Sequence, residues 1–172
     1  SENNGVRYHG FMHGDFMYQI DHAFMQFSCY WVWDEYYKKM FEELKCTQSM
    51  VVYKPGKYKP IVESKPLETD YEYYATYYFS GETKDAIDNL KPIFDKLRDC
   101  GKKCKLRPHP RFSNYDYIKQ VFSGYFIENC RECSLKKSLE TTFYCIAINS
   151  TVLSEAHHSG KKVVIDDLTN RN

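Results

Sequence analysis

The sequence predicts an α/β protein whose main element is an open, Rossmann-like parallel sheet with helices on both faces. From residue 71 onward, short runs rich in tyrosine, valine and isoleucine alternate with amphipathic stretches of helical period. Strands that are separated by helices in this way pair in parallel through right-handed crossovers. Such crossovers place helices on both faces of the sheet, which is the arrangement of doubly wound proteins.

The first part of the chain, residues 1–60, predicts strands around one helix. Residues 24–33 are aromatic and apolar enough for a buried strand. A helix is expected next, with Asp34 as its N-cap. The apolar residues at helical spacing are Tyr37, Met40, Phe41 and Leu44. A further β-rich run at residues 49–53 ends at the turn signal Lys54-Pro55-Gly56.

The second part, residues 71–172, predicts a regular alternation of strands and helices. Strands are expected at residues 73–79, 103–106, 125–128, 143–148 and 162–165. Helices are expected at residues 83–100, 115–122, 135–141 and 151–158. Residues 61–70, in a stretch rich in lysine and proline, are expected to be a linker between the two parts.

Composition and charge narrow the classes of function. The chain has 24 Lys and Arg against 23 Asp and Glu, so no overall field draws it toward nucleic acid. Any affinity for phosphate must therefore be local. Seven cysteines, an odd number, without an apolar signal segment or a long apolar run, favour free thiols in a reducing cytoplasm over a disulfide framework.

The loop Arg107-Pro108-His109-Pro110-Arg111 is the first candidate for a functional site. His109 stands between two prolines, so it can belong neither to a continuing helix nor to a central strand. The flanking arginines offer permanent charge and forked donors, and an imidazole can exchange a proton near neutral pH. The loop therefore predicts a phosphate site, and a solvated basic turn is the alternative.

Other polar residues follow neighbouring strands of the predicted sheet, beyond whose carboxyl ends ligands bind. Ser80 and Gly81 follow one strand, and Ser150 and Thr151 open a helix after another. A helix N-terminus favours an anion, although simple helix capping explains a serine and a threonine there as well. Glu128 ends a third strand, where it can accept a hydrogen bond from a ribose hydroxyl or simply be solvated.

Two sets of residues raise the question of metal binding. His9, His13 and Asp15 are separated by glycines, which argue against the helix that would align the imidazoles. Cys100-x3-Cys104 and Cys130-x2-Cys133 have spacings like those of zinc fingers. One pair precedes a strand and the other follows its neighbour, so they should lie about 15 Å apart, at opposite ends of the sheet. No metal is therefore expected.

Several short motifs, in their order along the chain, resemble those of a known family. They are His9-Gly10, the aromatic run at residues 30–36, Leu106-Arg107-Pro108-His109-Pro110-Arg111, residues 149–156 and residues 160–165. Together they are similar to bacterial GT-B glycosyltransferases of the sialyltransferase and polysialyltransferase type, which assemble surface polysaccharides. The similarity covers most of the chain. A similar His-Pro and Ser pattern occurs in the glycerophosphotransferases that build teichoic acids.

The resemblance implies that residues 71–172 are the donor-binding half of an inverting, metal-independent enzyme without a cofactor. The donor would be a CMP-linked sugar such as CMP-sialic acid. His109 would contact the donor phosphate and act as general acid for the leaving group. The residues expected to complete the donor site are Arg107, Pro110, Arg111, Ser150, Thr151, Ser80, Gly81 and Glu128. His9 and Gly10 are expected in a loop between domains.

The resemblance also implies partners and a location. The acceptor would be a saccharide or lipid-linked saccharide, and the enzyme would be cytoplasmic, at the inner face of the plasma membrane. The general base would be an acidic residue in an N-terminal Rossmann domain, within an acidic-acidic-Gly motif that this sequence lacks. Residues 1–60 are too short for that domain and are expected to be a remnant of it. The alternatives are a CDP-glycerol or CDP-ribitol phosphotransferase and a non-catalytic nucleotide-sugar-binding module.

Overall fold

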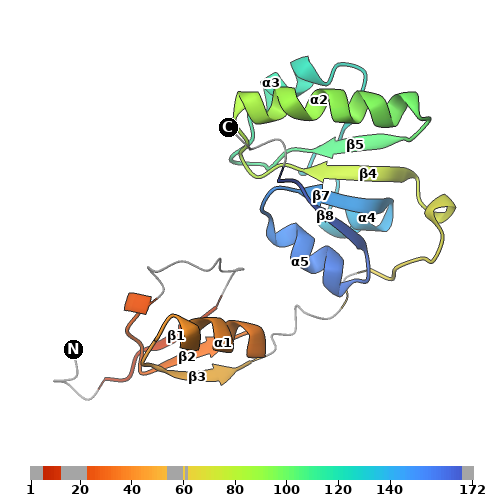
Figure 1. Ribbon diagram of the computed structural model, residues 1–172. Coiled ribbons are helices and arrows are strands. Elements are labelled where there is room, and N and C mark those ends of the chain that lie inside the picture. Colours follow the sequence, from red (N-terminus) through yellow and green to blue (C-terminus); the bar gives the residue numbers. More distant parts are fainter. Residues whose placement is uncertain (1–5, 13–22, 54–59, 61, 168–172) are drawn as a thin grey trace. The chain divides into compact units, whose positions relative to one another are not determined.

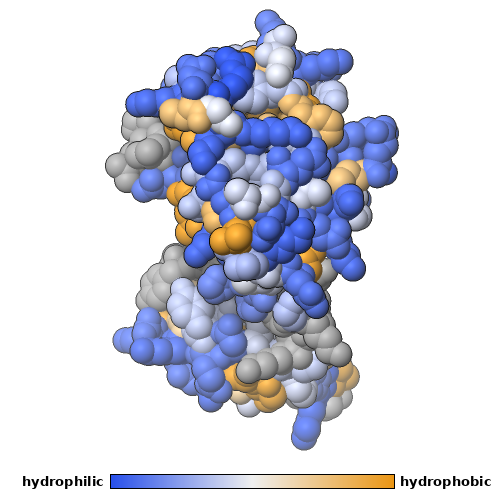
Figure 2. Space-filling model, turned by 90° about the vertical axis from the view of Figure 1, so that its right-hand side faces the viewer, coloured by the Kyte–Doolittle hydropathy of each residue, from blue (hydrophilic) through white to orange (hydrophobic). Residues whose placement is uncertain are grey.

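The computed structural model of the chain describes residues 6–12, 23–53, 60 and 62–167, which form parts of two compact units (Figure 1). The units comprise Ser1–Tyr58 and Lys59–Asn172, a division close to the expected boundary after residue 60. Each unit has a parallel sheet of its own. Hydrophilic residues dominate the face shown in Figure 2. Within the described residues, no helix is both long enough and apolar enough to cross a membrane.

The first unit contains three parallel strands in the order β1-β2-β3. They are β1 (His9–Phe11), β2 (Cys29–Val32) and β3 (Ser49–Val52). The strand expected at residues 24–33 therefore begins later than predicted. Gly10 belongs to β1, and the ring of Tyr30 fills the space that a Cβ atom at residue 10 would need. His9 and Gly10 thus lie in a strand, and the prediction that they form a loop is wrong.

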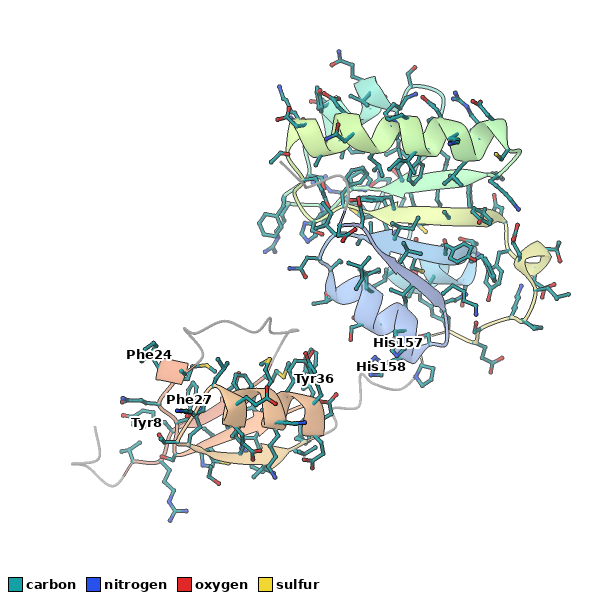
Figure 3. The ribbon with its side chains drawn as sticks, viewed as in Figure 1. Tyr8, Phe24, Phe27, Tyr36, His157 and His158 are labelled. Carbon is teal, nitrogen blue, oxygen red and sulfur yellow. The ribbon has the colours of Figure 1, made fainter. Side chains whose placement is uncertain are left out.

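Helix α1 (Glu35–Glu43) packs against one face of this sheet. Asp34 caps the helix as expected, and its side chain accepts a hydrogen bond from the backbone N–H of Tyr37. The buried residues of the shared core are Met12, Tyr30, Val32, Trp33, Met40, Phe41 and Leu44. Tyr36 on α1 is exposed (Figure 3), as is Phe11, which alternates with the buried residues of β1.

The second unit contains five parallel strands in the order β6-β5-β4-β7-β8. They are β4 (Tyr73–Tyr78), β5 (Cys104–Arg107), β6 (Phe126–Ile127), β7 (Thr142–Ala147) and β8 (Lys162–Ile165). Each lies close to its expected bounds, and the predicted Rossmann-like class is confirmed. The direction in which the chain adds strands reverses between β4 and β7, and ligands of such sheets bind at this kind of switch point.

Helices cover both faces of the five-stranded sheet (Figure 1). They are α2 (Lys84–Asp99), α3 (Tyr115–Val121), α4 (Leu135–Glu140) and α5 (Thr151–His158). On one face, α2 and α3 bury Phe94 and Ile118 against the strands. On the other face, α4 and α5 bury Leu139 and Ala156. The two apolar layers hold the sheet between them, so the loops at its carboxyl edge start from fixed positions.

The segment expected to be a linker, 61–70, falls within the second unit. Val62 is buried in the core on the α4 and α5 face, and Glu68–Asp70 form a short 3-10 helix. The buried side chain of Val62 anchors this segment, although lysine and proline dominate the composition around it. The turn expected at Lys54-Pro55-Gly56 lies outside the described residues.

Candidate functional site

At the carboxyl edge of the second sheet, the loop after β4 contacts the loop after β5 on one side and the loop after β7 on the other. The hydroxyl of Ser80, after β4, donates a hydrogen bond to the backbone oxygen of Asn149, after β7, at 2.6 Å. Gly81 lies against Phe112 of the loop after β5. A Cβ atom on Gly81 would be 3.2 Å from Phe112 Cβ, and the φ of Gly81 is 115°. Glycine is therefore required where these two loops touch.

The backbone donors of the loop after β4 already have an acceptor. The N–H of Ser80 donates to the two carboxylate oxygens of Glu82 at 3.0 and 2.8 Å, and the N–H of Gly81 donates to Oε2 at 3.0 Å. Successive backbone N–H groups of this kind form a concavity suited to an anion. Here the anion is the chain's own carboxylate, so Ser80 and Gly81 do not offer these donors to a phosphate.

Ser150 is the N-cap of α5, and its Oγ accepts a hydrogen bond from the backbone N–H of Val152 at 3.3 Å. Thr151, the first residue of the helix, is exposed. Strand β4 separates β7 from β5, so the loops after β7 and β5 are about 10 Å apart at a spacing of about 4.8 Å per strand. The structure therefore does not bring Ser150 or Thr151 to the hollow that His109 lines.

His109 is held in place by its own loop. Its Nδ1 accepts hydrogen bonds from the backbone N–H groups of Arg111 at 3.1 Å and Phe112 at 3.3 Å. The imidazole stacks on the ring of Phe112 with 4.6 Å between centroids, and its backbone N–H donates to Ser113 Oγ at 2.8 Å. Because Nδ1 is an acceptor, the proton of the neutral imidazole is on Nε2. The ring therefore presents one N–H donor in a defined orientation.

A hollow of about 300 Å³ opens between the loops after β5 and β6. Its lining residues are Pro108, His109, Pro110, Ser113, Tyr115, Glu128, Asn129, Cys130 and Arg131. The contribution of residues 129–131 was not predicted from the sequence. The signal was nevertheless present, because Asn-Cys-Arg directly follows a strand of the same parallel sheet, as the His-Pro motif does.

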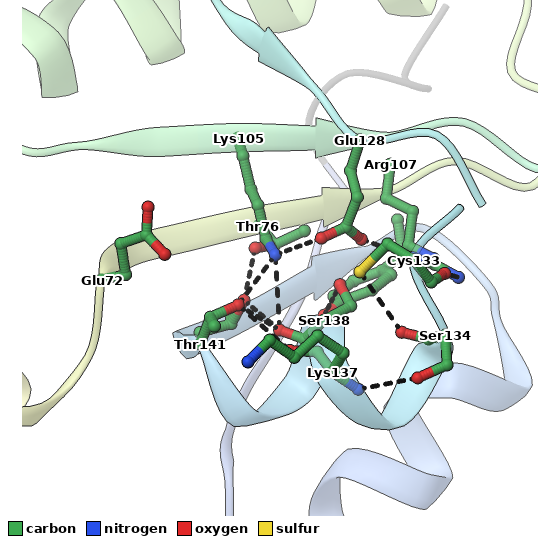
Figure 4. Close-up of polar contacts among 12 residues, drawn as sticks. Glu72, Thr76, Lys105, Arg107, Glu128, Cys133, Ser134, Lys137, Ser138 and Thr141 are labelled. Carbon is green, nitrogen blue, oxygen red and sulfur yellow. Dashed lines mark hydrogen bonds and ion pairs between the residues drawn. The ribbon is translucent and has the colours of Figure 1, made fainter. Parts of the chain in front are cut away.

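A buried ion network lies beside this hollow (Figure 4). The carboxylate of Glu128 pairs with Lys105 Nζ through Oε1 and with Arg107 Nη1 through Oε2, each at 2.5 Å. The side chains of Lys105, Glu128 and Arg107 are 1%, 4% and 10% exposed. Arg107 Nη2 also donates to the backbone oxygen of Cys133 at 2.9 Å, and Lys105 Nζ donates to Thr141 Oγ1 at 3.0 Å.

The network keeps Glu128 ionised in a buried position. Burial by itself would raise the pKa of this carboxyl, but hydrogen bonds from Lys105, Ser138 and Arg107 outweigh burial and hold the pKa below its ordinary value. The structure thus engages the guanidinium of Arg107 and both carboxylate oxygens of Glu128, which lines the hollow, in an internal network, so neither group is open to a ribose or a phosphate. The physical reason is that Lys105 and Arg107 share one face of a strand covered on both sides, and two buried cations require an anion.

Neither metal hypothesis finds support among the described residues, which contain no group of three side chains suited to a metal ion. His13 and Asp15 lie outside the described residues. All seven cysteines are free. Cys100 precedes β5 and Cys104 is the first residue of that strand, whereas Cys130 and Cys133 follow β6. The two pairs therefore lie at opposite ends of the sheet, as predicted.

Comparison with known proteins finds no match, either to a protein-family model or to a curated protein. The geometry of the carboxyl edge is therefore the basis for any proposal about its chemistry. That geometry combines an oriented N–H donor on His109 with the exposed residues Arg111 and Arg131. These groups suit an anionic ligand.

Proposed function

We propose that the second unit binds the phosphate of a nucleotide-linked sugar in the hollow beside His109, as the donor-binding part of a GT-B glycosyltransferase. One observation carries the proposal. The Nδ1 atom of His109 accepts two backbone N–H groups, so Nε2 has a proton to donate to a ligand. A phosphate oxygen is a strong acceptor for such a donor, and the hollow lies at the carboxyl edge where ligands of parallel sheets bind.

Arginine side chains supply the positive charge in this proposal. Arg107 is engaged with Glu128, whereas Arg111 and Arg131 are exposed and Arg131 lines the hollow. A guanidinium group can hold two phosphate oxygens at once. The partners proposed for the phosphate are therefore His109, Arg131 and Arg111.

The donor is proposed to be CMP-linked, with an acidic sugar such as sialic acid. This choice rests on the resemblance of residues 106–111 and 149–156 to the sialyltransferase type. In the reaction, the bond between the anomeric carbon and the phosphate oxygen breaks, and charge grows on the departing phosphate. The Nε2–H group of His109 would stabilise that charge as a hydrogen-bond donor. The acceptor would be a surface saccharide or its lipid-linked precursor, at the inner face of the plasma membrane.

Isothermal titration calorimetry with CMP, CDP, UDP and GDP tests the proposal. We expect the cytidine nucleotides to bind, and His109→Ala to weaken binding about tenfold or more, since a hydrogen bond to a charged group contributes about 1.5–3 kcal/mol. His157→Ala is the control, because His157 is exposed in the last turn of α5 (Figure 3). Failure of all four nucleotides to bind, or unchanged affinity in His109→Ala, would refute the proposal.

A non-catalytic nucleotide-sugar-binding module is the second candidate. Among the described residues that line the hollow, Glu128 is the only acid, and both of its oxygens pair with cations. The carboxylate in the hollow is therefore not available as a general base. Incubating the chain with CMP-sialic acid and an oligosaccharide acceptor separates the candidates. Transfer of the sugar favours the enzyme, and binding of the donor without transfer favours the module.

A further inference from the structure

The two cysteines after β6 belong to one turn of the chain. The backbone N–H groups of Glu132 and Cys133 both donate to the backbone oxygen of Asn129, at 3.1 and 2.9 Å. The side chain of Asn129 also accepts from the N–H of Arg131 at 3.0 Å and donates to Glu132 Oε1 at 2.7 Å. The bond from Cys133 to Asn129 has the spacing of an α-helical turn. Cys130 and Cys133, three residues apart, therefore lie on the same side of it.

The distance expected between the Cβ atoms of Cys130 and Cys133 is close to the Cβ–Cβ distance in a disulfide. Cβ atoms three residues apart on a helical turn are about 5–6 Å apart, whereas a disulfide has them about 3.5–4.5 Å apart. The turn must therefore tighten by about 1–2 Å for the bond to form. Its central residues, Arg131 and Glu132, are exposed, so this adjustment does not disturb a packed core.

Two other thiols of the second unit, those of Cys104 and Cys145, have surroundings that differ from those of Cys130 and Cys133. Cys104 and Cys145 are buried in the two cores, and burial raises the pKa of each thiol to about 11. Such thiols carry little thiolate at neutral pH and are shielded from oxidants. Cys130 and Cys133 are only half-buried. Burial and the nearby charge of Glu128 raise the pKa of Cys133, which disfavours Cys133 as the first nucleophile.

We propose that Cys130 and Cys133 form a reversible disulfide that regulates the hollow beside His109. The Cys130 thiolate attacks one sulfur of a small disulfide such as glutathione disulfide, which forms a mixed disulfide and releases one glutathione thiolate. The Cys133 thiolate then attacks the Cys130 sulfur and releases the second. The two cysteines together lose two protons and two electrons, and glutathione disulfide takes up these protons and electrons to become two molecules of reduced glutathione.

Two contacts connect the disulfide to the hollow. Cys130 is one of its lining residues. The backbone oxygen of Cys133 accepts from Arg107, whose guanidinium also pairs with Glu128 (Figure 4). Tightening the turn moves Cys130 and the backbone oxygen of Cys133, so the oxidised chain binds a nucleotide less well than the reduced chain. This regulatory part rests on the proposed function, whereas formation of the disulfide does not.

Peptide mapping of the unmodified chain tests formation of the disulfide. The chain is equilibrated with mixtures of reduced and oxidised glutathione, blocked with N-ethylmaleimide and digested with trypsin. Trypsin cleaves after Arg131, between the two cysteines, so residues 120–131 and 132–136 stay joined only by the disulfide. We expect joined peptides that separate on reduction. Their absence at every glutathione ratio, or joining of Cys133 to a different cysteine, overturns the proposal.

Titration of the oxidised and reduced chain with CDP tests the regulation. We expect the reduced chain to bind at least about fivefold more tightly. Cys133→Ser should abolish the difference, and Cys100→Ser, which removes an exposed thiol after α2, should preserve it. Equal affinity in both states overturns the regulation. Joined peptides without CDP binding in either state support the disulfide and contradict the proposed function and the regulation together.

Discussion

The loops after β4 and β5 lie side by side at the carboxyl edge of one sheet, yet they use their backbone donors differently. After β4, the N–H groups of Ser80 and Gly81 donate to the carboxylate of Glu82. After β5, two N–H groups donate to Nδ1 of His109, which leaves the proton of the ring on Nε2. The first loop therefore satisfies its donors within the chain, whereas the second orients a side-chain donor.

The arginines at this edge show the same contrast. Arg107 ends β5 and is directed inward to Glu128, whereas Arg131, after β6, is exposed and lines the hollow. Residue type and position after a strand do not distinguish the two. The partners that each donor already has decide which of them can meet a ligand.

Replacing Glu128 should have the largest effect on stability. Glu128→Gln leaves Lys105 and Arg107 buried with less than a full counter-charge, and breaking a buried ion pair costs about 3–5 kcal/mol. Urea unfolding followed by circular dichroism measures the loss. The fluorescence of Trp31 and Trp33, both in the first unit, reports on that unit separately.

The control for this substitution is Glu140→Gln. Glu140 pairs with Lys136 at 3.9 Å on the surface, so its loss should change stability by about 1 kcal/mol or less. An equal effect of the two substitutions would contradict a buried network. The pKa of Glu128 is below its ordinary value of 4.5 in the folded chain, so its stabilisation is complete above that value and is lost as pH falls through the lower one. Acidification should therefore destabilise the wild type more steeply than Glu128→Gln.

The outline of the second sheet could be predicted because local patterns determine it. Helices α2 and α4 begin within one residue of the expected starts at residues 83 and 135, and Thr83 and Ser134 are their N-caps. The partners of polar side chains could not be predicted in the same way. Glu128 meets Lys105 across two neighbouring strands, 23 residues apart in the chain. Contacts at that separation depend on strand order and register, which periodicity alone does not specify.

The loop after β4 offers a direct test of the contrast with His109. Glu82→Ala removes the acceptor of the Ser80 and Gly81 N–H groups, which should lower stability by about 1 kcal/mol. Glu82→Gln keeps one acceptor oxygen and should lose less. If the phosphate binds beside His109, the affinity for CDP stays the same in both variants. A rise in affinity on removing the carboxylate would instead identify the loop after β4 as the anion site.

Ser150 provides the smallest and most discriminating test of where the phosphate binds. Ser150→Ala removes the N-cap of α5 and should cost about 1 kcal/mol, whereas Ser150→Asn keeps a capping oxygen and should cost little. Neither should change CDP affinity, because Ser150 does not line the hollow. Thermal unfolding measures the change in stability, and calorimetry on the same samples measures the change in CDP affinity. If Ser150→Ala weakens CDP binding while the His109 side chain keeps its position, the ligand spans the edge from β5 to β7, as the sequence alone suggested.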